Sequence, residues 1–121
     1  MEIRTFQDLT VWRKSMDLLV EIYGIVKLLP PEERHALSDQ MRRAAVSIPS
    51  NIAEGHQRGT TKDYVRFLHI ARGSKAELET QLLICVRLDY LSVSQAEDAQ
   101  NLLAEIGRML NSLIRKLDAK S

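Results

Sequence analysis

The sequence has one cysteine and few aromatic residues, and these two shortages limit the possible disulfides, the compartment and the composition of the core. The single cysteine, Cys85, allows no disulfide within the chain and favours a reducing compartment. Aromatic residues make up only 5% of the 121 residues, whereas hydrophobic residues make up 45%, so the core must be mainly aliphatic. No apolar run approaches the roughly 18 residues of a membrane span, and no signal-peptide stretch follows Met1. We therefore expect a cytoplasmic protein without a membrane segment.

Motifs for catalysis and for metal binding are also missing. The paired Glu-x-x-His arrangement of di-iron bundles is missing, and Glu77 and Glu79 point in different directions on a helix. No glycine-rich phosphate loop follows a strand, and no elbow motif frames a serine. Cys85 lies on an apolar helix face, which predicts a buried and inert thiol. The sequence therefore predicts no enzyme, no cofactor, no metal site and no small-molecule substrate.

Hydrophobic spacing and helix-breaking residues divide the chain into four predicted helices. No segment has the alternation of a strand, and nothing repeats at the period of a solenoid. Pro30 and Pro31 end the first helix, and Gly59 ends the second. The predicted helices span about residues 9–29, 32–57, 61–89 and 94–118. With short connections, they predict one all-α domain over residues 1–121, an up-down-up-down four-helix bundle.

The first predicted helix carries two apolar stripes on nearly opposite sides. One stripe consists of Leu9, Trp12, Met16, Leu19 and Tyr23, and the other of Val11, Leu18, Ile22, Ile25 and Leu29. A helix in a lone bundle needs only one apolar face, so the second stripe predicts a contact with another copy of the chain. The predicted homo-oligomer interface consists of Val11, Leu18, Ile22 and Ile25. The alternative, in which both stripes belong to one wide core, stays open.

Basic residues concentrate in the middle of a nearly neutral chain. The formal net charge is +1, but residues 34–75 carry an excess of five positive charges, and the segments on either side each carry two excess negative charges. Such an asymmetry favours an anionic partner. The predicted nucleic-acid-binding residues are Arg42, Arg43, Lys62 and Arg66. A surface whose charges are merely solvated is the alternative interpretation.

Four stretches of the sequence resemble a known family. They are Phe6–Lys14, Gln40–Gly55 with its Ser-Ile-Pro-Ser-Asn-Ile-Ala-Glu-Gly ending, Phe67–Ser74 and Glu77–Leu82. Together they resemble the four-helix-bundle proteins encoded in intervening sequences of 23S ribosomal RNA genes, whose relatives include the accessory protein of diversity-generating retroelements. The resemblance implies a bundle that assembles into a homo-oligomeric ring, with a pentamer as the expected size, and it implies no catalytic residue.

Charge, patterning and resemblance leave two hypotheses for function. The first is a non-enzymatic oligomeric helical scaffold that associates with RNA or a ribonucleoprotein through the basic patch on the second and third helices. The second is a protein-interaction adaptor, such as an accessory subunit of a reverse transcriptase. A specific partner protein that stays bound after nuclease treatment would favour the second hypothesis.

Overall fold

The computed structural model contains four α-helices and no strands within residues 2–120, which are the residues that the structure describes. The helices are α1 (Thr10–Val26), α2 (Leu37–Gln57), α3 (Thr61–Arg87) and α4 (Val93–Lys120). Short 3-10 helices, η1 (Phe6–Asp8) and η2 (Pro31–Glu33), precede α1 and α2. The predicted all-α fold class is confirmed. The helix boundaries lie within three residues of their predicted positions, except at the start of α2.

Helix α2 begins at Leu37, five residues later than predicted. The residues from Pro31 form only one 3-10 turn, and Ala36 interrupts the helical path with φ −123° and ψ −103°. The Glu33 carboxylate accepts a hydrogen bond from the Leu37 backbone N–H at 3.3 Å and another from the Tyr90 hydroxyl at 2.8 Å. One acidic side chain therefore caps α2 and ties its start to the α3–α4 connection.

Capping side chains also define the starts of α3 and α4. Gly59, with φ +87°, turns the chain after α2, and the Thr60 hydroxyl oxygen accepts the Asp63 backbone N–H at 3.2 Å. At α4, the Gln95 backbone N–H donates to the Ser92 hydroxyl oxygen at 3.0 Å, and the Gln95 side chain accepts the Ser92 N–H at 2.8 Å. Such reciprocal bonds satisfy donors that the first helical turn leaves free.

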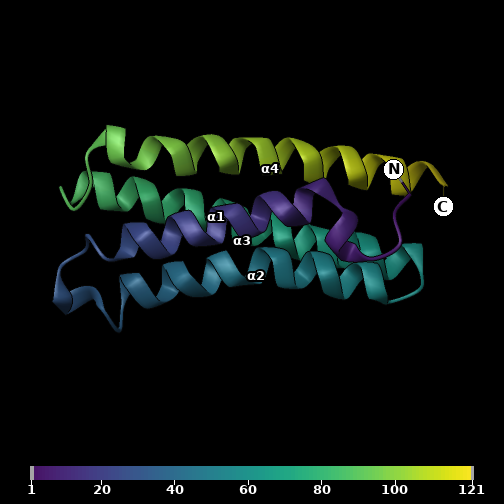
Figure 1. Ribbon diagram of the computed structural model, residues 1–121, viewed down its shortest axis with the longest axis horizontal. Helices are drawn as coiled ribbons and strands as arrows, with labels where there is room; N and C mark the ends of the chain where they lie inside the picture. The colour runs from purple at the N-terminus through teal and green to yellow at the C-terminus, as the bar shows by residue number, and fades with distance from the viewer. Residues whose placement is uncertain (1, 121) are drawn as a thin grey trace.

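Each helix packs against two neighbours, so that α1 contacts α2 and α4, and α3 also contacts α2 and α4. No contact joins α1 to α3 or α2 to α4 among the described residues. The pair α1–α2 and the pair α3–α4 therefore form opposite sides of the bundle. Figure 1 shows that the start of α1, the α2–α3 connection and the end of α4 lie at the same end. We call the adjoining half of the molecule the terminal half, and it comprises residues 2–17, 47–74 and 106–120.

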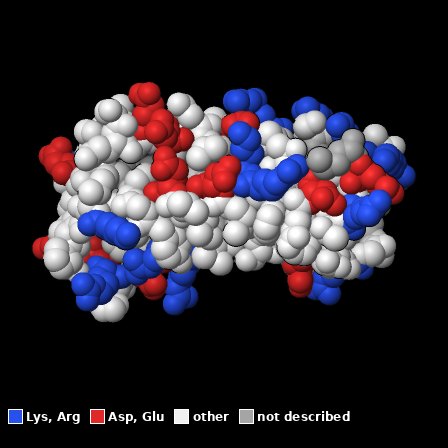
Figure 2. Space-filling model, in the orientation of Figure 1, with Lys and Arg blue, Asp and Glu red and all other residues white. Residues whose placement is uncertain are grey.

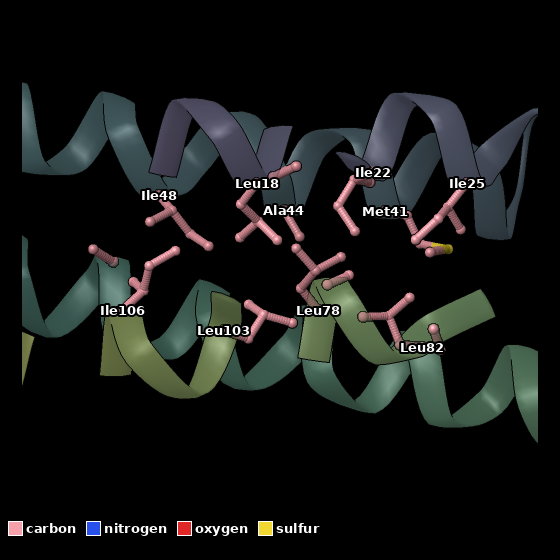
Figure 3. Packing of buried hydrophobic residues seen from close by; sticks show 14 of the residues in the cluster. Leu18, Ile22, Ile25, Met41, Ala44, Ile48, Leu78, Leu82, Leu103 and Ile106 are labelled. Atoms are coloured by element: carbon pink, nitrogen blue, oxygen red, sulfur yellow. The ribbon is translucent and has the colours of Figure 1, made fainter. Parts of the chain in front are cut away.

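The core is aliphatic, as the composition predicted. Figure 3 shows Leu18, Ala44, Leu78 and Leu103 converging from all four helices near the middle of the bundle. Burying one such leucine contributes roughly 1.5–3 kcal/mol. None of the largest fully buried side chains of the described chain is aromatic. None of the described helices has the length and apolarity that crossing a membrane requires.

The α2–α3 seam, which we define as the contact surface between these two helices, is closed by short side chains. The Ser47 and Ser74 hydroxyl groups lie 2.7 Å apart, and Asn51 donates to the Ser47 carbonyl oxygen at 2.8 Å. A Cβ atom added at Gly55 would lie 2.8 Å from the Cβ of Phe67. The two backbones therefore approach closely, and glycine is required where α3 crosses the last turns of α2.

Candidate functional site

The structure separates the predicted nucleic-acid-binding residues into two groups. Arg42 and Arg43 lie one turn into α2, whereas Lys62 and Arg66 lie in the first turns of α3. Residues 44–57, which are most of α2, stand between the two groups. At 1.5 Å per residue, that separation is about 20 Å. The four side chains are therefore not one compact patch.

Arg42 and Arg43 share one carboxylate. The Asp39 side chain lies 3.8 Å from Arg42 Nη2 and 3.2 Å from Arg43 Nε. Arg42 also donates to the backbone carbonyl oxygen of Arg34 at 3.2 Å. Half of the positive charge of this pair is therefore compensated next to it, and Asp39 and Arg43 have the i, i+4 spacing of helical ion pairs.

The second group gains a neighbour from the end of α2. The guanidinium carbon of Arg66 lies 4.5 Å from the centre of the Phe67 ring, and that of Arg58 lies 5.0 Å from it. Each arginine also has a carboxylate partner, Glu54 for Arg58 at 3.7 Å and Asp63 for Arg66 at 3.8 Å. The Phe67 ring thus holds two guanidinium groups at the α2–α3 connection through cation–π contacts.

Three arginines that the sequence interpretation left out complete this basic region. Arg72 on α3 donates to the side-chain oxygen of Asn111 on α4 at 2.9 Å. Arg108 and Arg115 are exposed on α4, three residues before Asn111 and four residues after it. Residues at these helical spacings lie on one side of a helix. The contact between Arg72 and Asn111 therefore brings together cations that are distant in the sequence.

Basic and acidic side chains divide between the two halves of the bundle. In the terminal half, eleven basic residues outnumber six acidic residues, whereas in the other half ten acidic residues outnumber six basic residues. Figure 2 shows the same division along α4, with acidic side chains over its first half and basic side chains over its second half. The nearly neutral chain is therefore an electrostatically polar molecule with a basic end.

The predicted oligomer interface is wrong, because its residues lie inside the bundle of a single chain. Val11, Leu18, Ile22 and Ile25 are all buried, and none is more than 7% exposed. The other stripe of α1 is the one that remains accessible, with Met16 and Tyr23 exposed and Trp12 and Leu19 partly buried. Helical spacing shows that two stripes exist, but it does not show which of them faces the core.

A groove between α1 and α2 contains this accessible stripe. It consists of two adjoining hollows of about 310 and 370 Å³, which meet at Val46 and Ser50. Trp12, Met16 and Leu19 line one hollow, and Tyr23 lines the other together with Arg42 and Arg43. Val20, which follows Leu19 on α1, is 70% exposed. The molecule thus presents an open apolar surface on the side opposite α3 and α4.

Titratable side chains elsewhere have structural partners. The Cys85 thiol is fully buried and lies 3.7 Å from the sulfur of Met41. Burial, with a smaller contribution from the charge of Glu33, raises the pKa of Cys85 to about 11. Glu79 pairs with Lys75 at 3.0 Å, as the helical spacing predicted. Among residues 2–120, no three His, Cys, Asp or Glu side chains gather in a way that could hold a metal ion.

The sequence as a whole matches one family. The family model for 23S rRNA-intervening sequence proteins matches residues 7–112, which is most of the chain. The chain belongs to the 23S rRNA-intervening sequence protein family. This confirms the resemblance carried by the four sequence stretches. No curated protein matches this family member.

A solved structure supports both the family and the fold. This member of the 23S rRNA-intervening sequence protein family is similar to a Bacteroides thetaiotaomicron protein of unknown function from the S23 ribosomal protein family. The two chains are 32% identical, with a TM-score of 0.80, and the match covers 87% of this chain and 98% of the other. Since that relative is described as having unknown function, the family assigns no activity to the residues of this chain.

Proposed function

We propose that the protein is a non-enzymatic helical scaffold that associates with RNA or a ribonucleoprotein through its basic terminal half. The observation that carries this proposal is the excess of five positive charges in that half, where Lys62 and Arg66 lie with Arg58, Arg72 and the basic residues of α4. Clustered Lys and Arg side chains bind phosphate by releasing the counterions of the nucleic acid. The family's link with ribosomal RNA genes is consistent with such a partner.

Self-association belongs to the same proposal. We propose an up-down-up-down bundle whose copies assemble into a closed ring, with five copies as the resemblance implies. The accessible groove lies on α1 and α2, and a second exposed apolar group, Leu83 and Val93, lines a hollow between α3 and α4. Contact between two different surfaces is head-to-tail, and it gives a closed ring when the rotation between copies closes.

A ring would also multiply the charge of the terminal half. In a cyclic assembly all copies have the same orientation, so their basic ends lie on one face of the ring. A single chain offers a modest positive surface, whereas several copies side by side offer a continuous one. This arrangement would let a cytoplasmic protein with a formal net charge of only +1 bind a polyanion.

Light scattering after size exclusion tests both parts, with nuclease-treated and untreated protein at low and high salt. We expect a discrete oligomer that carries nucleic acid only without nuclease and at low salt. The variant Val46→Glu should dissociate the oligomer, because Val46 is exposed and lines both hollows of the groove, so the charge enters the groove and not the core. Ile70→Glu is the matched control, since Ile70 is exposed on α3 outside both apolar surfaces.

Two results would contradict the proposal. If the protein is a monomer at all concentrations, the proposed self-association is wrong. If RNA binding is absent or does not depend on salt, the proposed association with RNA through the basic half is wrong. If a specific polypeptide remained bound after nuclease treatment, the protein would instead be a protein-interaction adaptor.

A further inference from the structure

The guanidinium group of Arg72 is held in place without being neutralised. Its Nη1 donates to Asn111 Oδ1 at 2.9 Å, and its Nη2 lies 2.8 Å from Nδ1 of His69. Because arginine is always a donor, the His69 nitrogen must accept, which places the imidazole proton on Nε2. Neither partner carries a negative charge. The positive charge of Arg72 is therefore oriented but remains uncompensated by these two contacts.

Arg72 differs in this respect from four other arginines within residues 34–75. Arg42, Arg43, Arg58 and Arg66 each have a carboxylate oxygen within 4 Å. Arg72 has none within the part of the chain that the structure describes. Two of its five N–H donors are occupied, which leaves three for a ligand. Such a side chain is prepared for an anion, because its orientation does not depend on the anion being present.

Neighbouring cations continue this feature over the exposed surface along the α3–α4 contact of the terminal half. We use the name α3–α4 groove for this surface, which consists of Lys62, Arg72, Arg108, Asn111 and Arg115. Arg108 and Arg115 are exposed and follow the side of α4 that carries Asn111. Lys62 stands two helical turns before His69 on the matching side of α3. From Arg108 to Arg115, the cations extend over about 10 Å of helix. Asp118 is the one carboxylate in this half of α4.

We propose that the α3–α4 groove of the terminal half, with Arg72 at its centre, binds the phosphate backbone of a single RNA strand. This inference rests on the proposed association with RNA and assigns that association to a specific surface. The guanidinium fork of arginine matches a phosphate group, and a row of exposed cations fits a chain of phosphates better than one enclosed anion. No aromatic residue is among the groove residues, so binding is independent of base sequence.

The groove is also separate from the surface proposed for self-association. The apolar groove lies between α1 and α2, on the opposite side of the bundle from α3 and α4, and the second apolar surface, with Leu83 and Val93, lies outside the terminal half. Substitutions at Arg72, Arg108 and Arg115 therefore leave the α1–α2 groove unchanged. RNA binding and assembly are thus measured independently, and a loss of binding is not a consequence of dissociation.

The test measures fluorescence anisotropy of a labelled 20-nucleotide oligouridylate with the full chain between 50 and 200 mM KCl. The groove variant combines R72Q, R108Q and R115Q. The matched control combines K27Q, R34Q and R87Q, which remove the same charge from exposed positions in the other half of the molecule and lie outside both apolar surfaces. We expect the groove variant to bind at least tenfold more weakly at 50 mM KCl. The slope of log K against log salt should fall by about 2, since each phosphate contact to a single strand contributes roughly 0.7.

A charge-neutral variant tests the orientation of Arg72. N111A removes the Oδ1 acceptor and leaves every charge in place. We expect binding to weaken about threefold with an unchanged salt slope, because the same cations remain but one is less well positioned. R72K should behave similarly, because lysine retains the charge without the guanidinium fork.

The outcomes separate this inference from the proposed function. If the unmodified protein binds no RNA, both the proposed function and the groove assignment fail. If RNA binds and the K27Q/R34Q/R87Q control loses as much affinity as the groove variant, the groove assignment fails and the association with RNA stands. If N111A and R72K bind as tightly as the unmodified protein, the central role of Arg72 is overturned.

Discussion

The α2–α3 seam and the α3–α4 seam of this bundle are made from different kinds of contact. Across the α2–α3 seam, Gly55 lies against Phe67, and Ser47 meets Ser74 at 2.7 Å. Across the α3–α4 seam, which we define as the contact surface between those helices, the stem of Lys75 passes over Gly107, and Arg72 reaches Asn111. One seam is therefore closed by backbone and short side chains, and the other is bridged by long cationic side chains.

This difference shows where the molecule can interact with a partner. In the α2–α3 seam, the polar groups of the short side chains form hydrogen bonds within the seam, and these contacts stabilise the fold. Long side chains bury their apolar stems and keep their charges at the surface, where an anion can reach them. We therefore expect substitutions in the α2–α3 seam to change stability, and substitutions in the α3–α4 seam to change binding.

The largest expected effect concerns Cys85 in the closed seam. Its pKa is raised from 9.0 to about 11, chiefly because the thiol is buried. Since the thiolate is the nucleophile, two units of pKa lower the reactive fraction at pH 8 by roughly 100-fold. Alkylation by iodoacetamide at pH 8 should be at least that much slower in the folded protein than in urea. The rate should also keep rising between pH 9 and pH 10, where an ordinary thiol begins to level off.

The unfolded protein in urea serves as the control for Cys85, because it has the same sequence without the burial. Mass spectrometry of samples quenched over time gives both rates. Alkylation of the folded protein at nearly the unfolded rate would show that the α2–α3 seam opens locally, and the contrast between the seams would disappear.

A smaller effect is expected for Gly55→Ala in the same seam. The new Cβ would lie 2.8 Å from Phe67 Cβ, 3.1 Å from Tyr64 Cδ1 and 3.2 Å from the Tyr64 carbonyl oxygen. Relieving these contacts requires α3 to move as a whole. We expect the free energy of unfolding to fall by about 2 kcal/mol, because overpacking outweighs the gain in helix propensity. Urea denaturation followed by circular dichroism at a fixed protein concentration measures the change.

Helix positions follow closely from the sequence because their limits are set by local chemistry. Gly59 and Thr60 separate α2 from α3 at the predicted place, since a positive φ and a capping hydroxyl act within a few residues. The start of α2 was less predictable. Pro31 and the acidic residues after it suit a helical first turn, but Glu33 instead binds Leu37 and Tyr90, and Tyr90 is distant in sequence.

The orientation of α1 could not be predicted from its own sequence. Its two stripes are both apolar, and only the packing of the other helices decides that Leu18 and Ile22 face inward while Met16 and Tyr23 face solvent. Fold class depends on the number and length of helices. The identity of an exposed face depends on tertiary contacts, which helical periodicity does not contain.

The candidate site was predicted only in part for a similar reason. Lys62 and Arg66 lie in the basic half, but Arg42 and Arg43 lie in the other half because α2 runs the length of the molecule. The basic residues of α4 could not be assigned to the site from segment charges, because residues 76–121 together have a net charge of −2. That sum conceals an acidic first half of the helix and a basic second half, and only the fold places the basic half beside Arg72.

The smallest expected effect, for Gly107→Ala, tests the comparison most directly. A new Cβ here would lie 2.8 Å from both Cε and Nζ of Lys75, as close as the contact at Gly55. The obstacle, however, is the end of a flexible side chain, which can move while its ion pair with Glu79 re-forms. Alanine also favours the helix by about 1 kcal/mol relative to glycine. We therefore expect the free energy of unfolding to change by less than about 0.5 kcal/mol under the conditions used for Gly55→Ala. A loss equal to that of Gly55→Ala would mean that the Lys75 stem is fixed and that both seams are equally closed.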